Sequence, residues 1–61
     1  MTKFFFIHNH MPSALFDSQE SAEDAAQFHK NPDNCIQFYR VTLKSSGQFV
    51  IVFVGKWHKD N

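Results

Sequence analysis

The chain has little cysteine, little glycine and no long apolar run, and each shortage excludes a class of protein. Its single cysteine, Cys35, cannot form an internal disulfide, which excludes a disulfide-stapled scaffold and leads us to expect a cytoplasmic protein. The two glycines fall at expected turn or strand-end positions, so no glycine-rich loop remains to cradle a phosphate. The longest apolar run, residues 49–54, is far shorter than the roughly 18 residues that span a bilayer.

Net charge is also missing. Six lysines and arginines balance six aspartates and glutamates, so the chain has no overall field that would attract nucleic acid or an anionic membrane. Aromatic residues are abundant instead: eight phenylalanines, one tyrosine and one tryptophan among 61 residues. At this length we expect residues 1–61 to form one small domain, near the lower limit for a self-sufficient core.

The first half of the chain predicts a strand followed by a helix. Residues 3–8 are aromatic and β-branched, which favours a strand. Residues 18–30 carry alanines at helical spacing, and either Asp17 or Ser18 can cap this helix. Pro32 is expected to mark its end, because proline cannot continue a helix.

The second half predicts two strands, residues 35–43 and 48–54, joined by a hairpin in which Gly47 is available for a positive φ. Because residues 49–54 contain no polar side chain, we expect the last strand in the middle of the sheet. The predicted fold class is therefore α+β: a single β-α-β-β domain with a three-stranded antiparallel sheet in the order 2-3-1 and one helix packed on one face. The alternative order, 1-2-3, is expected to need a right-handed parallel crossover.

Alternation along the hairpin, with Leu43 opposite Gln48, divides its side chains between two apolar faces. We expect the alanine stripe of the helix to pack on the phenylalanine-rich face, because small side chains allow close approach. The other face then remains uncovered, and it forms the predicted interaction surface: Tyr39, Val41, Val50, Val52 and Val54.

An uncovered apolar face of this size is unusual in a soluble monomer. The sequence therefore predicts a non-catalytic protein–protein interaction module, a homodimer formed through this face or an unprotected edge strand, with Tyr39 as the anchor. One alternative is that the loop carrying Met11, Leu15 and Phe16, or the tail with Trp57, folds over the face. Another is that a different protein occupies it, as in small accessory proteins of phages and other mobile elements that bind and inhibit a host protein.

A further alternative is a single-stranded nucleic-acid binder that uses the tail Lys56-Trp57-His58-Lys59. A tryptophan between cations can stack on a base, which makes Lys56, Trp57 and Lys59 the candidate contacts. The neutral charge of the whole chain argues against this class, and we expect no membrane partner.

The four histidines raise the question of a metal site. His8 and His10 are two residues apart, a spacing that places both imidazoles on one side of a strand. No Cys-x-x-Cys or His-x-x-x-His spacing accompanies them, so we expect no metal and no cofactor, with His8 and His10 as the remaining metal candidates. A Cys35–His29 pair lacks a recognisable orienting group or oxyanion hole, and we expect no enzyme.

Overall fold

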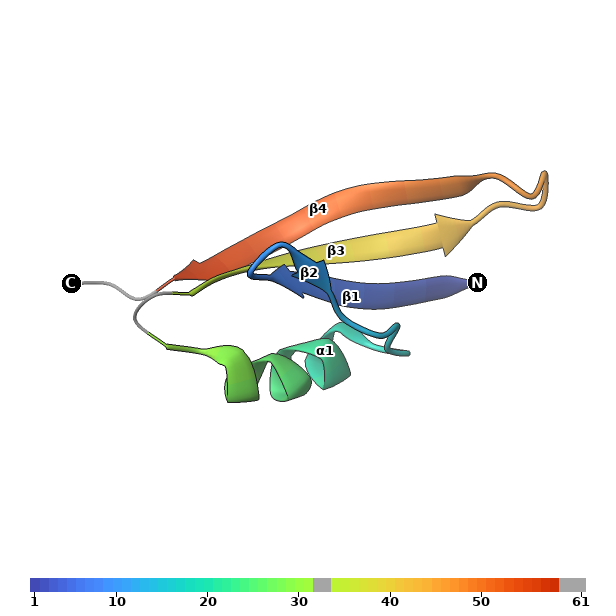
Figure 1. The fold of residues 1–61 in the computed structure, drawn as a ribbon. Helices are drawn as coiled ribbons and strands as arrows, with labels where there is room; N and C mark the ends of the chain where they lie inside the picture. The colour runs from blue at the N-terminus through green and yellow to red at the C-terminus, as the bar shows by residue number, and fades with distance from the viewer. Residues whose placement is uncertain (32–33, 59–61) are drawn as a thin grey trace.

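The computed structural model describes residues 1–31 and 34–58. It contains four strands, β1 (Thr2–His8), β2 (Met11–Pro12), β3 (Cys35–Leu43) and β4 (Phe49–His58). The helix α1 (Gln19–Ala26) continues into one 3-10 turn, η1 (Gln27–His29). These elements confirm a small α+β fold with one α-helix below an antiparallel sheet in the order β2-β1-β3-β4 (Figure 1). Pro32 lies outside the described residues.

The predicted order of the long strands is wrong, because β3 and not β4 lies in the centre of the sheet. β1 pairs antiparallel with β3, and His8 lies opposite Ile36. The cause is the segment between β1 and the helix cap, residues 9–17, which we call the return segment. It runs back along β1, so that Phe4 and Phe16 exchange two backbone hydrogen bonds of 2.8 and 2.7 Å. This additional pass reverses the chain direction once more before α1. β3 therefore meets β1 antiparallel, and no parallel crossover is needed.

The same segment supplies a fourth strand, where the sequence predicted a loop. Asn9 and His10 have φ values of 48° and 64°, so both central residues of the turn between β1 and β2 are left-handed. A two-residue turn with this conformation matches the right-handed twist of paired strands. β2 places Pro12 opposite Ile7, and proline is tolerated there because β2 is the edge of the sheet.

The helix begins at the second of its two candidate caps. The Oγ atom of Ser18 accepts a hydrogen bond of 3.0 Å from the backbone N–H of Ser21. Asp17 instead forms an ion pair with Lys3 on β1. The residue before the cap thus ties the return segment to the sheet.

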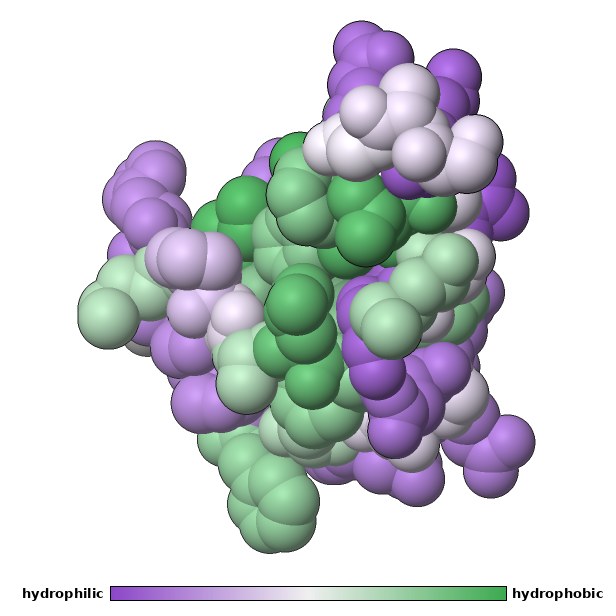
Figure 2. All heavy atoms as spheres, turned by 90° about the vertical axis from the view of Figure 1, so that its right-hand side faces the viewer, coloured by the Kyte–Doolittle hydropathy of each residue, from purple (hydrophilic) through white to green (hydrophobic). Residues whose placement is uncertain are grey.

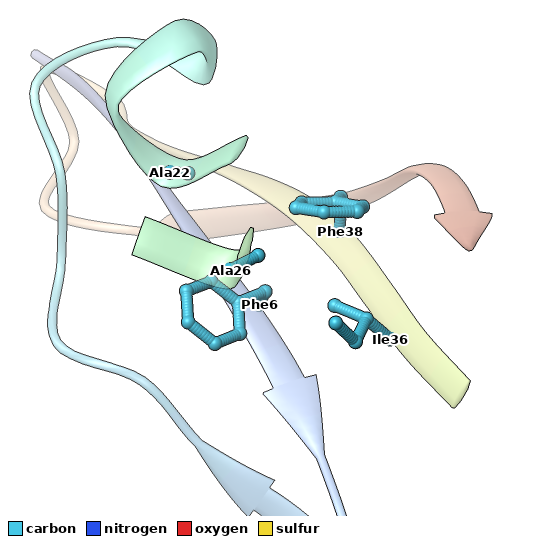
Figure 3. Packing of buried hydrophobic residues seen from close by; sticks show 5 residues of the cluster. All are labelled: Phe6, Ala22, Ala26, Ile36 and Phe38. Carbon is cyan, nitrogen blue, oxygen red and sulfur yellow. The ribbon is translucent and has the colours of Figure 1, made fainter. Parts of the chain in front are cut away.

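The core lies between α1 and the central strands, as Figure 3 shows. Two alanines of α1 lie against side chains of β1 and β3, and all five core residues are at most 9% exposed: Phe6, Ala22, Ala26, Ile36 and Phe38. The eight residues of α1 span about 12 Å, whereas the ten residues of β4 span about 33 Å. The helix is therefore too short to cover the sheet along its whole length. No helix in the described part of the chain is long and apolar enough to cross a membrane.

The hairpin between β3 and β4 has a three-residue loop, residues 45–47, where the sequence predicted a four-residue connection, residues 44–47. The N–H of Gly47 donates to the carbonyl of Lys44, and the N–H of Lys44 donates to the carbonyl of Gln48, both at 2.9 Å. Gly47 has a φ of 88°, which completes a three-residue loop made of a turn and a left-handed residue. Leu43 consequently lies opposite Phe49 rather than Gln48.

This shift moves the first half of β4 to the other face of the sheet, because side chains alternate with a period of two. Phe49, Ile51 and Phe53 therefore face away from α1, which overturns their predicted place in the core. A second irregularity, opposite the Phe38–Tyr39 step of β3, reverses the effect further along β4. Trp57 then lies opposite Ile36 and packs against the core.

Candidate interaction surface

The face of the sheet opposite α1 is apolar and is not covered by any described segment of the chain. We call it the open face. It begins beside Lys3 on β1 and reaches the hairpin, and its apolar side chains come from three strands: Phe5, Tyr39, Val41, Leu43, Phe49, Ile51 and Phe53. Figure 2 views the molecule from the hairpin end and shows apolar residues gathered across the middle of this end, with polar residues around them.

The exposure of the open face is greatest on β4. The exposed fractions of Phe49, Ile51 and Phe53 are 64%, 60% and 54%. These three side chains are thus more exposed than buried, although they belong to the residue types that proteins most often bury. Because they alternate along one strand, they form one contiguous surface rather than scattered exposed positions.

Three aromatic rings cross the open face from strand to strand, and we call them the aromatic ridge. The rings of Phe5 and Tyr39 are stacked with centroids 5.3 Å apart, and Phe53 meets Tyr39 edge-on at 5.6 Å. The hydroxyl of Tyr39 donates a hydrogen bond of 3.3 Å to the side-chain oxygen of Gln37. The central ring is therefore held on both sides and at its tip, which lowers the entropy that a partner must remove on binding.

An apolar hollow of about 430 Å³ lies beside the aromatic ridge. Its lining combines side chains of β3 and β4 with Leu15 from the return segment and two residues near the N-terminus: Met1, Lys3, Phe5, Leu15, Val41, Leu43, Phe49 and Ile51. The one charged member of this lining, Lys3, is bound to Asp17. The open face thus carries a row of three aromatic rings and an apolar hollow side by side, with Phe5 belonging to both.

The structure divides the predicted interaction surface between the two faces. Tyr39 and Val41 lie on the open face, as part of the ridge and of the hollow. Val50 and Val52 lie on the helix side, opposite Thr42 and Arg40. Val54 is skipped by the register and lines a groove beside α1.

The sequence reasoning missed Phe49, Ile51 and Phe53, which it assigned to the core. The signal that identifies them is Gly47, whose place in the loop allows the three-residue hairpin as well as the four-residue one.

The segments that were alternatives for covering the open face lie elsewhere. Phe16 and Trp57 both pack against the core on the helix side. Leu15 is 60% exposed and reaches only the border of the hollow. The open face is therefore left without a cover from these residues.

Two of the residues considered for nucleic-acid contact, Lys56 and Trp57, do not share a face of the sheet. Trp57 lies opposite Ile36 and Lys56 opposite Gln37, so the two side chains leave β4 on different faces. The Nζ of Lys30 lies 5.3 Å from the centroid of the Trp57 ring and occupies the place of a stacking base. Lys59 lies outside the described residues.

The two metal candidates are separated by the turn between β1 and β2. The ring of His8 stacks on that of His29, with centroids 3.9 Å apart, beside the core. His10 lies in the turn and lines a polar hollow together with Asn34 and Cys35. Within residues 1–31 and 34–58, no group of three His, Cys, Asp or Glu side chains is placed to hold a metal ion.

One ionic contact borders the open face. The hydrogen bond from Lys3 and the positive charge of its ammonium group hold the pKa of the Asp17 carboxyl below its ordinary value of 3.8. The Asp17 side chain is 87% exposed, so solvent screens this pair and it contributes little to stability.

Comparison of the chain with known protein families, with curated proteins and with solved structures finds no match.

Proposed function

We propose that the chain is a small, non-catalytic protein-interaction module that self-associates through the open face of its sheet. The observation that carries this proposal is the contiguous exposure of Phe49, Ile51 and Phe53 beside the aromatic ridge. Burial of apolar surface contributes roughly 25 cal/mol per Å², so covering these side chains is a strong driving force for association. The hollow is lined almost entirely by apolar side chains, which suits packing against a protein rather than chemistry on a polar substrate.

A second copy of the chain fits this face because the face carries a ridge and a hollow next to each other. In a contact with two-fold symmetry, the ridge of each copy enters the hollow of the other. Sheets packed in this way lie about 10 Å apart, a spacing that interdigitated side chains fill. The equal numbers of acidic and basic residues mean that no net repulsion separates two copies.

A pair of neighbouring substitutions on β3 tests the proposal. Val41 and Thr42 are both half-buried and β-branched, but Val41 lines the hollow while Thr42 lies on the helix side. We expect Val41→Lys to abolish the face contact, because it places an ammonium group in the apolar hollow. We expect Thr42→Lys to leave the association constant of the face contact unchanged.

Sedimentation equilibrium measures the mass of each variant, and circular dichroism establishes that each one is folded. The face contact is supported if the mass of Val41→Lys is half that of the unmodified chain and the mass of Thr42→Lys is unchanged. The same mass for Val41→Lys and for the unmodified chain contradicts it. A monomeric unmodified chain also contradicts self-association, and leaves the open face to a different protein.

A further inference from the structure

Along residues 49–53, the outer edge of β4 has no neighbouring strand in the described part of the chain. β4 is the last strand of the sheet, and no strand among residues 1–31 and 34–58 lies beyond it. The hydrogen bond from Lys44 to Gln48 fixes which residues of β4 turn their backbone groups toward β3, because these groups alternate along an antiparallel pair. The backbone N–H and C=O groups of Val50 and Val52 point toward β3. Those of Phe49, Ile51 and Phe53 therefore point outward, away from β3.

The side chains of β4 are also exposed on the face that α1 covers elsewhere. Val52 and Val54 are 39% and 38% exposed on the helix side, while Phe49 and Ile51 are exposed on the open face. A continuous apolar run is typical of a strand that is buried on both faces in the middle of a sheet, not of an exposed edge strand. β4 therefore has the composition of a central strand and the position of an edge strand.

The regular part of β4 has a sequence that reads the same in both directions. It runs Phe49-Val50-Ile51-Val52-Phe53, between the loop and the irregularity at Val54. When such a strand pairs antiparallel with a copy of itself around Ile51, each residue lies opposite an identical residue. In this pairing the two copies are related by a two-fold axis perpendicular to the sheet. The open faces of both copies therefore lie on the same side of the combined sheet.

From these observations we infer that β4 pairs antiparallel with β4 of a second copy, centred on Ile51. Ile51 then lies opposite Ile51 of the other copy, and Phe49 lies opposite Phe53 of the other copy. The outward backbone groups of these three residues form the hydrogen bonds between the copies. About six backbone hydrogen bonds form, two for each directly bonded pair. No charged side chain lies in the paired stretch, so the two strands approach without repulsion.

The opposite edge of the sheet cannot continue this pairing. There, β1 is covered by the return segment, whose Ser13 N–H donates to the carbonyl of Phe6 at 2.7 Å, and β2 carries Pro12. Short edge strands and proline are devices that block strand addition. Pairing through β4 therefore closes at two copies and does not grow into a fibre.

This contact is separate from the proposed function, because it uses the edge of β4 whereas the proposed function uses the open face. With both contacts in place, four copies assemble as two edge-paired dimers whose open faces meet. With the edge contact alone, two copies join. The experiment is therefore done in the Val41→Lys background, where failure of the face contact does not affect the result.

Cross-linking at helix-side positions of β4 tests the inference. Val50 lies opposite Val52 of the other copy in a pair without direct hydrogen bonds, where Cα atoms are about 4.5 Å apart and a disulfide fits. Two variants, Val50→Cys and Val52→Cys, each also carrying Cys35→Ser, are mixed in equal amounts, with one of them labelled with nitrogen-15. Mild oxidation with copper phenanthroline in air then joins adjacent thiols, and mass spectrometry distinguishes the products.

We expect the mixed disulfide dimer in clear excess over a random mixture, and little cross-linking of either variant alone. Contact through the open face cannot produce this product, because both valines lie on the opposite side of the sheet. A random mixture of cross-linked species, or none at all in folded samples, overturns the inference.

A backbone variant gives an independent test that leaves every side chain unchanged. A chain of 61 residues is within reach of chemical synthesis, so Ile51 can be introduced with a methyl group on its backbone nitrogen. This group removes an outward donor and leaves the ladder between β3 and β4 intact. We expect loss of the edge dimer with an unchanged circular dichroism spectrum, relative to an unmethylated synthetic chain. Persistence of the dimer overturns the inference.

Discussion

Ile36 and Ile51 lie on neighbouring strands of one sheet, yet Ile36 is fully buried and Ile51 is 60% exposed. Phe6 and Phe53 differ in the same way, with exposed fractions of 2% and 54%. The residue types are the same, so hydrophobicity does not decide which of them form the core. The deciding factor is whether α1 lies over the residue, and α1 reaches only one end of one face.

The comparison separates two roles for apolar residues. At the covered end, they supply the stability of the single chain. On the open face and along β4, they contribute little to that stability and are available for contacts between chains.

Truncation of the two isoleucines has the largest expected contrast. Ile36→Ala removes a fully buried side chain, and we expect a loss of about 2–5 kcal/mol in the free energy of unfolding. Ile51→Ala is expected to change the unfolding of the dissociated chain by less than about 0.5 kcal/mol, and to weaken association instead. Urea denaturation at low protein concentration measures both values. Equal losses for the two variants would contradict the division of roles.

Enlarging an alanine on the helix tests how closely α1 approaches the sheet. Ala26 is 0% exposed, so Ala26→Leu is expected to overpack the core and to destabilise the chain by about 1–3 kcal/mol. Ala14 is exposed and serves as the matched control, with little change expected for Ala14→Leu. The midpoint of thermal unfolding compares the two. An unchanged midpoint for Ala26→Leu would show that the helix does not pack closely.

The two glycines offer a test of the register that turns β4 outward. Gly47→Ala places a side chain at a φ of 88° and is expected to cost about 1 kcal/mol. Gly55 has an ordinary φ, and an added Cβ there meets nothing within 4 Å, so Gly55→Ala is expected to be neutral. Urea denaturation measures the cost of each substitution. Equal effects of the two would mean that Gly47 does not set the turn.

The smallest expected effect concerns the ion pair beside the open face. Because the folded-state pKa of Asp17 is lowered by Lys3, the contribution of this pair is present above the ordinary pKa of 3.8. It is lost as the pH falls through the lower folded-state value. In an NMR titration, the Asp17 carboxyl is expected to have its midpoint below 3.8 in the unmodified chain and to return toward 3.8 in Lys3→Gln. Identical midpoints would show that the pair does not form in solution.

The fold class was accessible from the sequence because its signals are local. Aromatic and β-branched runs gave the long strands, and the spacing of Ala22 and Ala26 gave the buried face of the helix. The strand order was not accessible from these signals, because it depends on how many times the chain reverses. The backbone bonds between Phe4 and Phe16 add one reversal, and they leave no periodic pattern in the sequence.

The composition of the open face was missed for a different reason. A single additional residue in a loop exchanges the two faces of the strand that follows. Gly47 allowed two loop lengths, and the predicted four-residue loop placed Phe49 and Ile51 in the core, whereas the observed three-residue loop turns them to the open face. Tyr39 and Val41 precede the loop, and their predicted face was therefore unaffected by this choice.

Sedimentation equilibrium of the untagged chain over a series of concentrations decides whether copies of the chain associate. We expect masses at multiples of 7.1 kDa that fall on dilution, because the exposed side chains of β4 are covered only when copies associate. A mass of 7.1 kDa at every concentration, up to the limit of solubility, would contradict this expectation.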